Sequence, residues 1–382
     1  MPLLFLIADT GGGHRASANA VARQLGMAHP GDYNCHIVDP FAQASPWLIG
    51  RTADLYGPII RHAPWFWGAL YHSTDSPRAV ALLRALALRT VEPGIGRLLA
   101  SLEPAAVVSF HPLLNHVAGR ALKRAGIRRV PLITVITDLV DVHASWACPS
   151  ADAIVTPSPH GHRACLAAGI PAGRCFQLGL PVDGGFIDTP ARAEEDRVQL
   201  RRRLDIDAHG FTVVLCGGAD GSGGLVDRAR ALAAADVDVQ LVVICGRNRA
   251  AMRALSQIRD HRGRPLAVRG FVDNMPDWLR AADLIVTKAG PGTIAEALCS
   301  GVPMLLSSYL PGQEKGNVGW VEETGAGKYV PKVEDMVHAV RELAIDGSPA
   351  YASMREAVRR AARPEATAEI ANLVVRFAHA PG

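Results

Sequence analysis

The stretch DLIVTKAGPGTIAEALCSGVPMLLSS (283–308) decides the fold. DLIVTKAG (283–290) has the apolar run of a buried strand, TIAEALCSG has a helical pattern, and PMLLSS (303–308) has the pattern of a second strand. A strand, a helix and a further strand in this order make a parallel pair with a crossover helix. The stretch therefore predicts an α/β protein with parallel sheets.

The same alternation continues on both sides of this stretch, with one interruption. The segment 184–205 is charged, punctuated by glycine and poor in β-branched residues, which is typical of a linker that leads into a surface helix. We therefore expect two doubly wound Rossmann-like domains, 1–188 and 189–382, facing a cleft, with a last helix at about 352–378 that belongs to either domain. The other expected strands are 3–8, 35–39, 105–110, 131–137, 152–156, 174–179, 211–218, 239–246 and 265–271.

Composition excludes several classes of protein. A length of 382 residues, 49% of them apolar, is enough for two cores. The net charge of +4, with no basic block longer than LRRRL (200–204), argues against a nucleic-acid binder. The seven cysteines form no C-x-x-C pair, which predicts a reducing compartment without disulfides or zinc. The start of the chain reads as a buried strand, and no window has the ~18 unbroken apolar residues of a spanning helix.

The glycine loop at 290–293 is the strongest sign of a binding site. Gly290 and Gly292 let an anion approach the backbone, and the N–H groups at the start of the following helix bind phosphate. Ala289 precedes this loop, Thr293 lies in it, and Glu296 lies one turn into the helix, where a carboxylate can accept from ribose hydroxyls. The alternative is an ordinary turn in which Thr293 caps the helix.

Three further loops of the second half are candidates with ordinary alternatives. The glycine-rich loop 215–224 could admit the same diphosphate or be a flexible turn. The segment 269–284 carries an aromatic residue that either flanks a base or fills the core, and 309–317 is either a sugar-binding or a plain polar loop. The candidate residues are Gly217, Gly218, Phe271, Val272, Gln313 and Glu314.

The first glycine loop, IADTGGGHRASA (7–18), leads to two hypotheses. It fits a relaxed dinucleotide fingerprint, with Asp39 as the ribose-binding acid, and so keeps an NAD-dependent oxidoreductase open. If the nucleotide instead binds at 290–293, this loop presents His14 as a general base for a hydroxyl. A capping histidine is the ordinary alternative.

Polar residues follow two other strands of the first half. SFHPLLNH (109–116) and VITDLVDVHASW (135–146) supply side chains that either line an acceptor site or orient His14. The D-x-D strings that start at Asp205 and Asp236 precede strands, so we expect solvated turns and no metal site. The candidates are His111, Asn115, Asp138 and His143.

An aromatic segment, SPWLIGRTADLYGPIIRHAPWFWGALYH (45–72), separates the second and third expected strands. Aromatic residues interleaved with cations are typical of a segment at a bilayer interface, and a buried subdomain is the alternative. The candidates for membrane contact are Trp47, Trp65, Phe66 and Trp67.

Taken in order, these motifs resemble the GT-B glycosyltransferases that make monogalactosyl- and glucosyl-diacylglycerol, relatives of the peptidoglycan lipid-intermediate transferase. DTGGGHRASA, HPLLNHVAGRALK, VITDL with HASW, LCGGADG, KAGPGTIAEAL and PGQEKGN carry the resemblance, which spans about residues 5–330. HASWA departs from the plant-type HPTWF.

The resemblance implies a GT-B fold and an inverting transfer of a hexose, galactose or glucose, from a UDP-sugar to 1,2-diacylglycerol without a metal or other cofactor. The partners would be the UDP-hexose, diacylglycerol and a membrane surface with anionic lipid, and the location would be the cytoplasmic face of a bacterial cell membrane. A nucleotide-sugar epimerase is the alternative of the same architecture. The implied base is His14, the implied donor contacts are Gly12, Gly13, Gly217, Gly218, Phe271, Val272, Ala289, Gly290, Gly292, Thr293, Glu296, Gln313 and Glu314, and the implied acceptor contacts are His111, Asn115, Asp138 and Trp146.

Overall fold

All eleven expected strands are present in a computed structural model of the chain, which confirms the α/β fold class. The structure describes residues 1–9, 12–44, 64–127, 129–187, 194–219, 221 and 223–380. These residues form two compact units. The first contains residues 1–184, 311–314 and 364–382, and the second contains residues 185–310 and 315–363.

The first unit is built on a parallel sheet of six strands in the order β2-β1-β3-β4-β5-β6. The residues of its four inner strands are almost all buried, because helices cover both faces of a parallel sheet, whereas the edge strands β2 and β6 are largely half-buried. The strands are β1 (Pro2–Leu6), β2 (Asn34–Val38), β3 (Ala106–Ser109), β4 (Leu132–Val135), β5 (Ala153–Thr156) and β6 (Cys175–Gln177).

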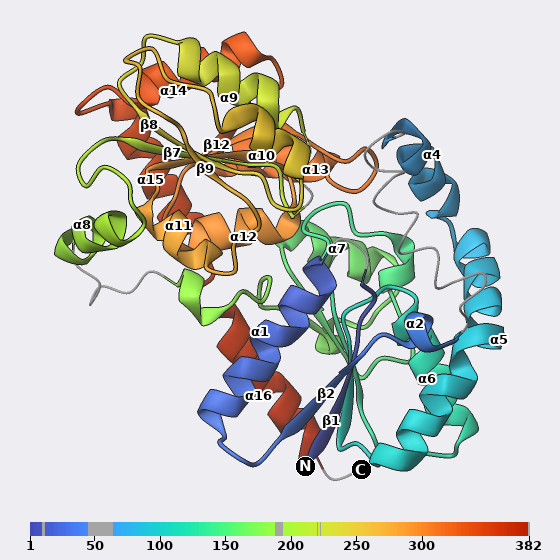
Figure 1. Ribbon diagram of the computed structural model, residues 1–382. Coiled ribbons are helices and arrows are strands. Elements are labelled where there is room, and N and C mark those ends of the chain that lie inside the picture. Colours follow the sequence, from blue (N-terminus) through green and yellow to red (C-terminus); the bar gives the residue numbers. More distant parts are fainter. Residues whose placement is uncertain are drawn as a thin grey trace. The chain divides into compact units, whose positions relative to one another are not determined.

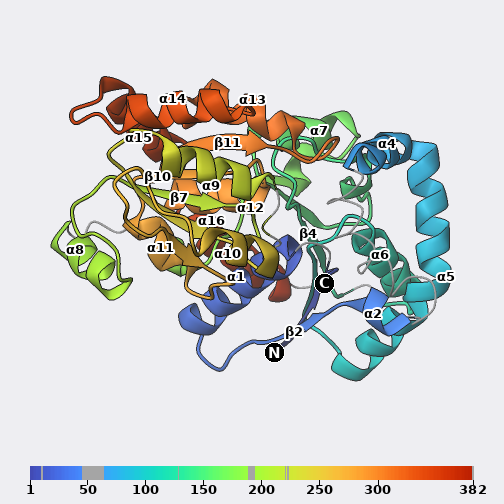
Figure 2. The ribbon, with the colours of Figure 1, turned by 45° about the horizontal axis from the view of Figure 1, so that its top comes forward.

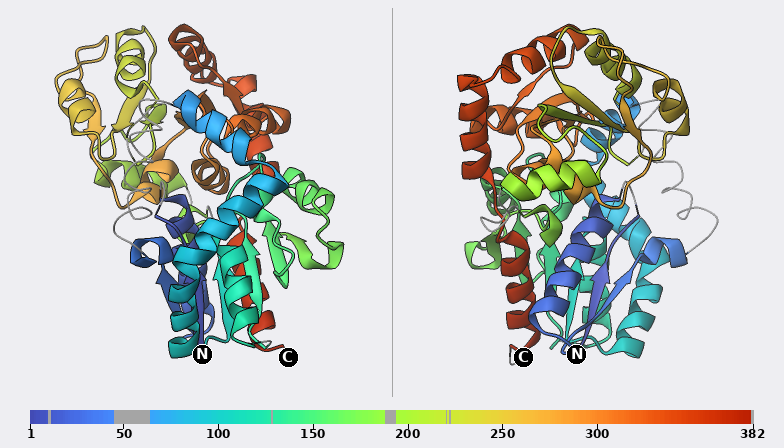
Figure 3. Two further views of the ribbon diagram at one scale, coloured as in Figure 1. Left: turned by 90° about the vertical axis from the view of Figure 1, so that its right-hand side faces the viewer. Right: turned by 60° about the vertical axis from the view of Figure 1, so that its left-hand side comes forward.

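Helices cover both faces of this sheet (Figure 1). α1 (Gly13–Ala28) and α16 (Ala366–Ala378) pack side by side on one face, where Leu25 and Val374 are fully buried (Figure 3). α5 (Pro77–Leu102) and α6 (Leu114–Arg124) pack on the other face. The remaining helices of the first unit are α2 (Pro40–Ala44), α4 (Pro64–Thr74), α7 (Pro159–Ala167) and the short 3-10 turns Ala144–Trp146 and Ala172–Arg174.

The second unit repeats the architecture with the strand order β12-β11-β10-β7-β8-β9. The strand β12 (Gly327–Tyr329) was not expected from the sequence, since GKY has no apolar run. It pairs closely with β11, and a Cβ at Gly327 would lie 2.3 Å from the carbonyl oxygen of Met304, so this edge accepts only glycine there. The other strands are β7 (Thr212–Cys216), β8 (Gln240–Ile244), β9 (Ala267–Arg269), β10 (Leu284–Lys288) and β11 (Met304–Ser308).

Helices also cover both faces of the second sheet (Figure 2). The core on one face contains residues of α9 (Leu225–Ala234), α10 (Arg249–Leu255) and α14 (Val333–Leu343). The remaining helices of this unit are α8 (Glu194–Arg203), α11 (Met275–Ala281), α12 (Pro291–Cys299), α13 (Lys315–Thr324), α15 (Pro349–Ala361) and the 3-10 turn Gly184–Phe186 at the boundary.

The single last helix expected at about 352–378 is two helices, which corrects that prediction. α15 ends at Ala361 in the second unit, and α16 begins at Ala366 in the first. Pro364 lies between them and has no N–H group with which to continue α15. In the first unit, Thr367 Oγ1 accepts from Val182 N at 2.9 Å and donates to Val182 O at 2.7 Å, which fixes the start of α16.

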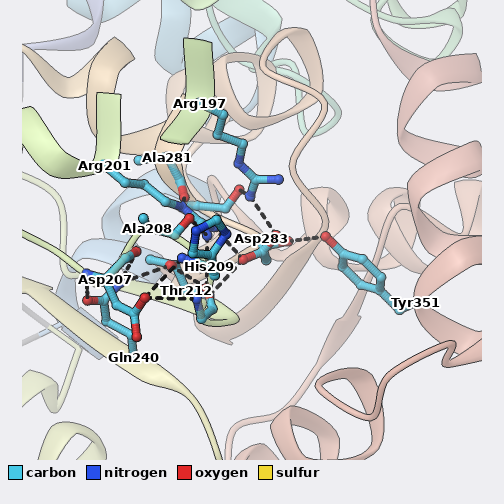
Figure 4. A network of polar contacts seen from close by, with 12 residues as sticks. Arg197, Arg201, Asp207, Ala208, His209, Thr212, Gln240, Ala281, Asp283 and Tyr351 are labelled. Atoms are coloured by element: carbon cyan, nitrogen blue, oxygen red, sulfur yellow. Dashed lines mark hydrogen bonds and ion pairs between the residues drawn. The ribbon is translucent and has the colours of Figure 1, made fainter. Parts of the chain in front are cut away.

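A buried ion-pair network ties α8 to the sheet of the second unit (Figure 4). Asp283, just before β10, accepts from Arg197 at 2.5 Å and from Arg201 at 2.7 Å, and its Oδ2 also accepts from the backbone N–H of Thr212 at 2.7 Å. The side chain of Arg201 is 5% exposed and donates to the carbonyl oxygens of Ala281 and Gly210 as well. α8 lies within the charged segment 184–205, in which a linker leading into a surface helix was expected, and ion pairs hold it to the second unit.

Candidate active site

The first sheet places the loops that carry His14 and His111 at one edge. β2 lies on one side of β1 and β3 on the other, so the winding direction reverses between β1 and β3. Ligands bind open α/β sheets at such a point, beyond the carboxyl ends of the strands. The loop after β1 leads to His14 and the loop after β3 contains His111, and the ring centroids of the two histidines are 5.2 Å apart.

The backbone at the start of α1 requires glycine at one position. Gly12 has φ +83, the left-handed region in which glycine is favoured, and it precedes the first helical residue, Gly13. His14 is therefore in the first turn of α1. Gly12 and Gly13 are exposed, and no side chain caps this helix.

The residues of the dinucleotide fingerprint are engaged in structural contacts. Arg15 makes two hydrogen bonds of 2.6 Å to the carboxylate of Asp9. Asp39, the expected ribose-binding acid, accepts from the backbone N–H groups of Asp9 and Phe41, each at 2.9 Å. The carboxylate of Asp39 therefore joins the end of β1 to the start of α2. Because both of its oxygen atoms accept from the backbone, this structural role argues against the ribose contact that the NAD hypothesis requires.

His14 is a neutral imidazole held by a hydroxyl group. A hydrogen bond of 3.0 Å joins its Nδ1 to Oγ1 of Thr137, a buried residue in the loop after β4. Burial lowers the pKa of His14 to about 4, against the opposing effects of a hydrogen bond to the backbone of Phe110 and of the Asp9 carboxylate. Burial also lowers the pKa of His111 well below its usual value. At neutral pH His14 is therefore unprotonated and able to accept a proton.

Asp138 follows Thr137 and is buried. Its Oδ2 accepts from Trp146 Nε1 at 2.6 Å and its Oδ1 from Gln313 Nε2 at 2.9 Å. Burial raises the pKa of Asp138 to about 6, although these two hydrogen bonds lower it. Gln313 and the buried Glu314 belong by contact to the first unit, although they lie within the range 189–382 expected for the second domain.

Two of the side chains expected to contact the acceptor are fully buried. Trp146 is 0% exposed and lies under His14, with ring centroids 6.3 Å apart. Asn115 is also 0% exposed, and its Nδ2 donates to the carbonyl oxygens of Ser145 and Trp146. These two side chains pack in the core at the 3-10 turn Ala144–Trp146, next to His14, and so support the site. His143 is likewise buried, with its ring 4.9 Å from that of Tyr71 in α4.

The second sheet repeats the reversal between β7 and β10. The loop after β10 contains Gly290, the N-cap of α12, and Pro291 occupies the first turn. No side chain caps α12, so the alternative in which Thr293 is the cap does not hold. A Cβ at Gly292 would meet nothing within 4 Å, which leaves its backbone open to a ligand. The first turn of α12 therefore has the features of an anion site.

The loop after β7 lies beside the end of β10. Gly218 has φ +73, and a Cβ there would lie 3.5 Å from Cε of Lys288. The pKa of Cys216, at the end of β7, is raised to about 11, mainly by burial; Glu296 contributes to the rise and Lys288 opposes it. Gly217, Gly218, Lys288 and Glu296 therefore share one edge of the second sheet with Gly290–Thr293.

Phe271 is exposed, which rejects the alternative that it fills the core. Its side chain is 63% exposed in the loop after β9, and the guanidinium group of Arg247 lies 5.8 Å from the ring centroid. The neighbouring Val272 is half-buried. Ala289, in contrast, is fully buried. Its N–H group donates to the carbonyl oxygen of Ser308 at 2.8 Å and is therefore not available to the UDP-sugar.

Helix α4 carries three of the four aromatic residues expected at a membrane. Trp65 is 71% exposed and Phe66 46%, whereas Trp67 is half-buried; Trp47 lies outside the described residues. Figure 2 shows α4 next to α5. Among the described helices, none combines the length and the apolar character needed to cross a bilayer.

The described residues contain no group of three or more His, Cys, Asp or Glu side chains placed to hold a metal ion. Asp236, from one of the two D-x-D strings, is 97% exposed at its side chain and lies 3.5 Å from Nε2 of His261. The expectation that these strings are solvated turns fits this position.

Two residues of the site were missed in the sequence. Thr137 carries no signal of its own, although it lies directly before the candidate Asp138. Lys288 lies in the quoted motif TKAG and ends a strand that points to the phosphate loop, so its position and charge together could have identified it.

Comparisons with known proteins agree with this geometry. The sequence model of the monogalactosyldiacylglycerol (MGDG) synthase family matches residues 14–182, and that of the glycosyltransferase family 28 C-terminal domain matches residues 212–367. The chain is 34% identical to monogalactosyldiacylglycerol synthase of Spinacia oleracea, over 96% of this chain and 71% of that protein. It is 35% identical to monogalactosyldiacylglycerol synthase 1 of Arabidopsis thaliana, over 96% and 69%. Both relatives are chloroplastic.

Solved structures share the fold. MurG of Acinetobacter baumannii superposes with a TM-score of 0.62 at 18% identity, over 98% of this chain and 100% of that chain. A UDP-GlcNAc 2-epimerase from Neisseria meningitidis, bound to UDP-GlcNAc, gives 0.63 at 11% identity, over 98% and 100%. These neighbours agree with the predicted GT-B architecture, and the sequence relatives identify the kind of enzyme: the chain belongs to the monogalactosyldiacylglycerol synthase family of glycosyltransferases.

Proposed function

We propose that this enzyme transfers galactose from UDP-galactose to the hydroxyl group of 1,2-diacylglycerol with inversion at the anomeric carbon. The observation that carries the proposal is the 34% identity to a monogalactosyldiacylglycerol synthase over 96% of the chain. The epimerase alternative rests on a shared fold at 11% identity, which is weaker support. Glucose remains the second donor to be tested.

In the proposed reaction, Nε2 of His14 takes the proton of the diacylglycerol hydroxyl while the hydroxyl oxygen attacks the anomeric carbon. For this, Nδ1 must carry the ring proton and donate it to Thr137 Oγ1, 3.0 Å away. The bond from the anomeric carbon to the diphosphate breaks, and the amides of Gly292 and Thr293 stabilise the charge that develops on UDP. Lys288 adds a positive charge at the same edge.

No metal or other cofactor is assigned to this reaction. The proposal is supported by the uncapped first turn of α12, whose N–H groups supply positive potential to the diphosphate. We further propose that the enzyme binds peripherally to the inner face of the cell membrane, with Trp65 and Phe66 of α4 at the lipid surface.

One assay tests the function. The purified protein is incubated with vesicles that contain diacylglycerol and with UDP-galactose or UDP-glucose, with and without EDTA and anionic lipid, and the lipid product is identified by mass spectrometry. We expect monogalactosyldiacylglycerol in the presence of EDTA. Transfer from UDP-glucose alone would overturn the choice of sugar, and loss of transfer with EDTA would overturn metal independence.

Glu296→Ala is expected to weaken UDP binding about tenfold or more, because a hydrogen bond to a charged group contributes about 1.5–3 kcal/mol. Isothermal titration calorimetry with UDP measures the effect. Glu323→Ala, at an exposed position of α13, is the matched control and should bind UDP like the wild type. Equal affinity in the Glu296 variant would remove Glu296 from the ribose site.

Thr137→Val is expected to lower kcat about two- to tenfold and to leave the KM for the sugar donor unchanged. The variant loses one hydrogen bond to Nδ1 of His14, which is worth about 0.5–1.5 kcal/mol. Thr137→Ser keeps the hydroxyl group and should recover most of kcat. A wild-type kcat in the valine variant would mean that Thr137 does not orient the imidazole.

A further inference from the structure

Asp138 is a buried carboxyl group that takes no part in the proton transfer proposed for His14. Each of its oxygen atoms accepts a hydrogen bond within the first unit: Oδ2 from Trp146 Nε1 at 2.6 Å and Oδ1 from Gln313 Nε2 at 2.9 Å. A buried carboxylate needs such donors because burial removes it from water. The two donors come from distant parts of the chain, so Asp138 connects the turn that holds Trp146 with the loop that holds Gln313.

This contact determines the orientation of the Gln313 amide. An ionised carboxylate only accepts hydrogen bonds, so the amide must turn its nitrogen to Asp138. The amide oxygen Oε1 then points elsewhere, and it is buried with no hydrogen-bond partner among the described residues. A buried acceptor without a partner is unfavourable, so Oε1 has a strong preference for a group that donates.

The backbone around Gln313 is held in place as well. A Cβ at Gly68 of α4 would lie 2.8 Å from Cβ of Pro311, and a Cβ at Gly312 would lie 3.0 Å from Cβ of Tyr71. Gly312 also has φ +86, which glycine adopts without strain. The loop 311–314 therefore packs directly on α4, which fixes the position of the backbone on either side of Gln313.

We propose that Asp138 is a positioning residue for the sugar donor: it binds Nε2 of Gln313 and so reserves Oε1 to accept a hydrogen bond from one hydroxyl group of the hexose. This inference rests on the proposed UDP-hexose donor, and it specifies the direction of the hydrogen bond between Gln313 and the sugar. The sugar hydroxyl donates and the protein accepts. Because Oε1 is covered, the side chains around it must move aside when the hexose binds.

Asp138→Asn is the matched variant. Its Oδ1 can still accept from Trp146, but its NH₂ group must donate, and the nearest acceptor is Oε1 of Gln313 after the amide turns over. Oε1 is then no longer available to the sugar. Gln313→Met removes the same acceptor with a side chain of similar length and serves as the second variant.

Equilibrium binding of UDP-galactose and of analogues with one ring hydroxyl replaced by fluorine gives the test, because fluorine cannot donate. In the wild type, one analogue should bind about tenfold more weakly than UDP-galactose, the worth of one hydrogen bond. In Asp138→Asn and in Gln313→Met, UDP-galactose and that analogue should bind alike, and the double variant should add no further loss. UDP alone should bind equally to all four proteins.

The outcomes separate this inference from the proposed function. Wild-type protein that binds no UDP-galactose would reject the proposed donor itself. Wild-type protein that distinguishes the analogue, together with variants that still distinguish it tenfold, would reject the role of Asp138. Melting temperatures show whether the variants are folded, and Asp138→Asn should melt no lower than the wild type because it removes a buried charge.

A pH series provides an independent check. The pKa of Asp138 is raised to about 6: burial raises it most, the hydrogen bonds from Gln313 and Trp146 oppose this, and the nearby Glu314 and Asp141 contribute to the rise. Below this pH the protonated carboxyl group donates to Oε1 of Gln313, so the preference for UDP-galactose over the fluorinated analogue should fall as the pH drops from about 7 to 5. In Asp138→Asn the preference should be absent at every pH. A wild-type preference that is constant over this range would contradict the proposal.

Discussion

His14→Ala is expected to lower kcat by about two to four orders of magnitude, the usual worth of a general base. The imidazole is neutral because burial lowers its pKa to about 4, and its Nδ1 is held 3.0 Å from Thr137 Oγ1. Alanine removes the proton acceptor and leaves the phosphate loop of the second unit unchanged. Initial rates with UDP-galactose and diacylglycerol vesicles measure the loss, and calorimetry should find wild-type affinity for UDP.

His338→Ala, at an exposed position of α14, is the matched histidine control and should keep wild-type rates. The pH dependence adds a second criterion. The imidazole accepts a proton only above its own pKa, so the loss of activity that His14 causes on acidification should lie near pH 4. A kcat for His14→Ala within a few-fold of the wild type would remove His14 from the proton transfer.

Asp283→Ala should lower the free energy of unfolding by about 3–5 kcal/mol, because it leaves buried cations without their counter-charge. Asp283 is 13% exposed at its side chain and pairs with Arg197 and Arg201 (Figure 4). Its Oδ2 also accepts from the N–H of Thr212, so the substitution breaks a contact to β7. Urea unfolding of the full chain measures the change.

Glu356→Ala is the control for this prediction, since Glu356 also lies near two arginines but at the surface. Its side chain is 53% exposed, at 3.1 Å from Arg359 and 3.8 Å from Arg360. Exposed pairs contribute about 0–1 kcal/mol, so the loss should be correspondingly small. If both variants lose the same stability, burial is not what makes the Asp283 network important.

Local pattern was enough to predict His14 and the loop 290–293 as candidate site residues. Both lie where an apolar strand ends in glycine and a helix begins, and the carboxyl ends of parallel strands are known to carry the ligand sites. The same reasoning brought His111 into the site. It did not predict that Asn115 and Trp146 are fully buried, because a side chain near the end of a strand can point into the core as well as toward a ligand, and only packing distinguishes the two.

The sequence by itself determined the class of fold, the order of the strands along the chain and the family, because these follow from apolar periodicity and short motifs. The tertiary structure alone decided which distant groups meet. Thr137 and His14 are 123 positions apart in the sequence and Gln313 and Asp138 are 175 apart, yet each pair forms a hydrogen bond. No local pattern in the sequence indicates either pair. The physical reason is that a residue's own neighbours set its backbone conformation, whereas its hydrogen-bond partner is set by how sheets and helices pack.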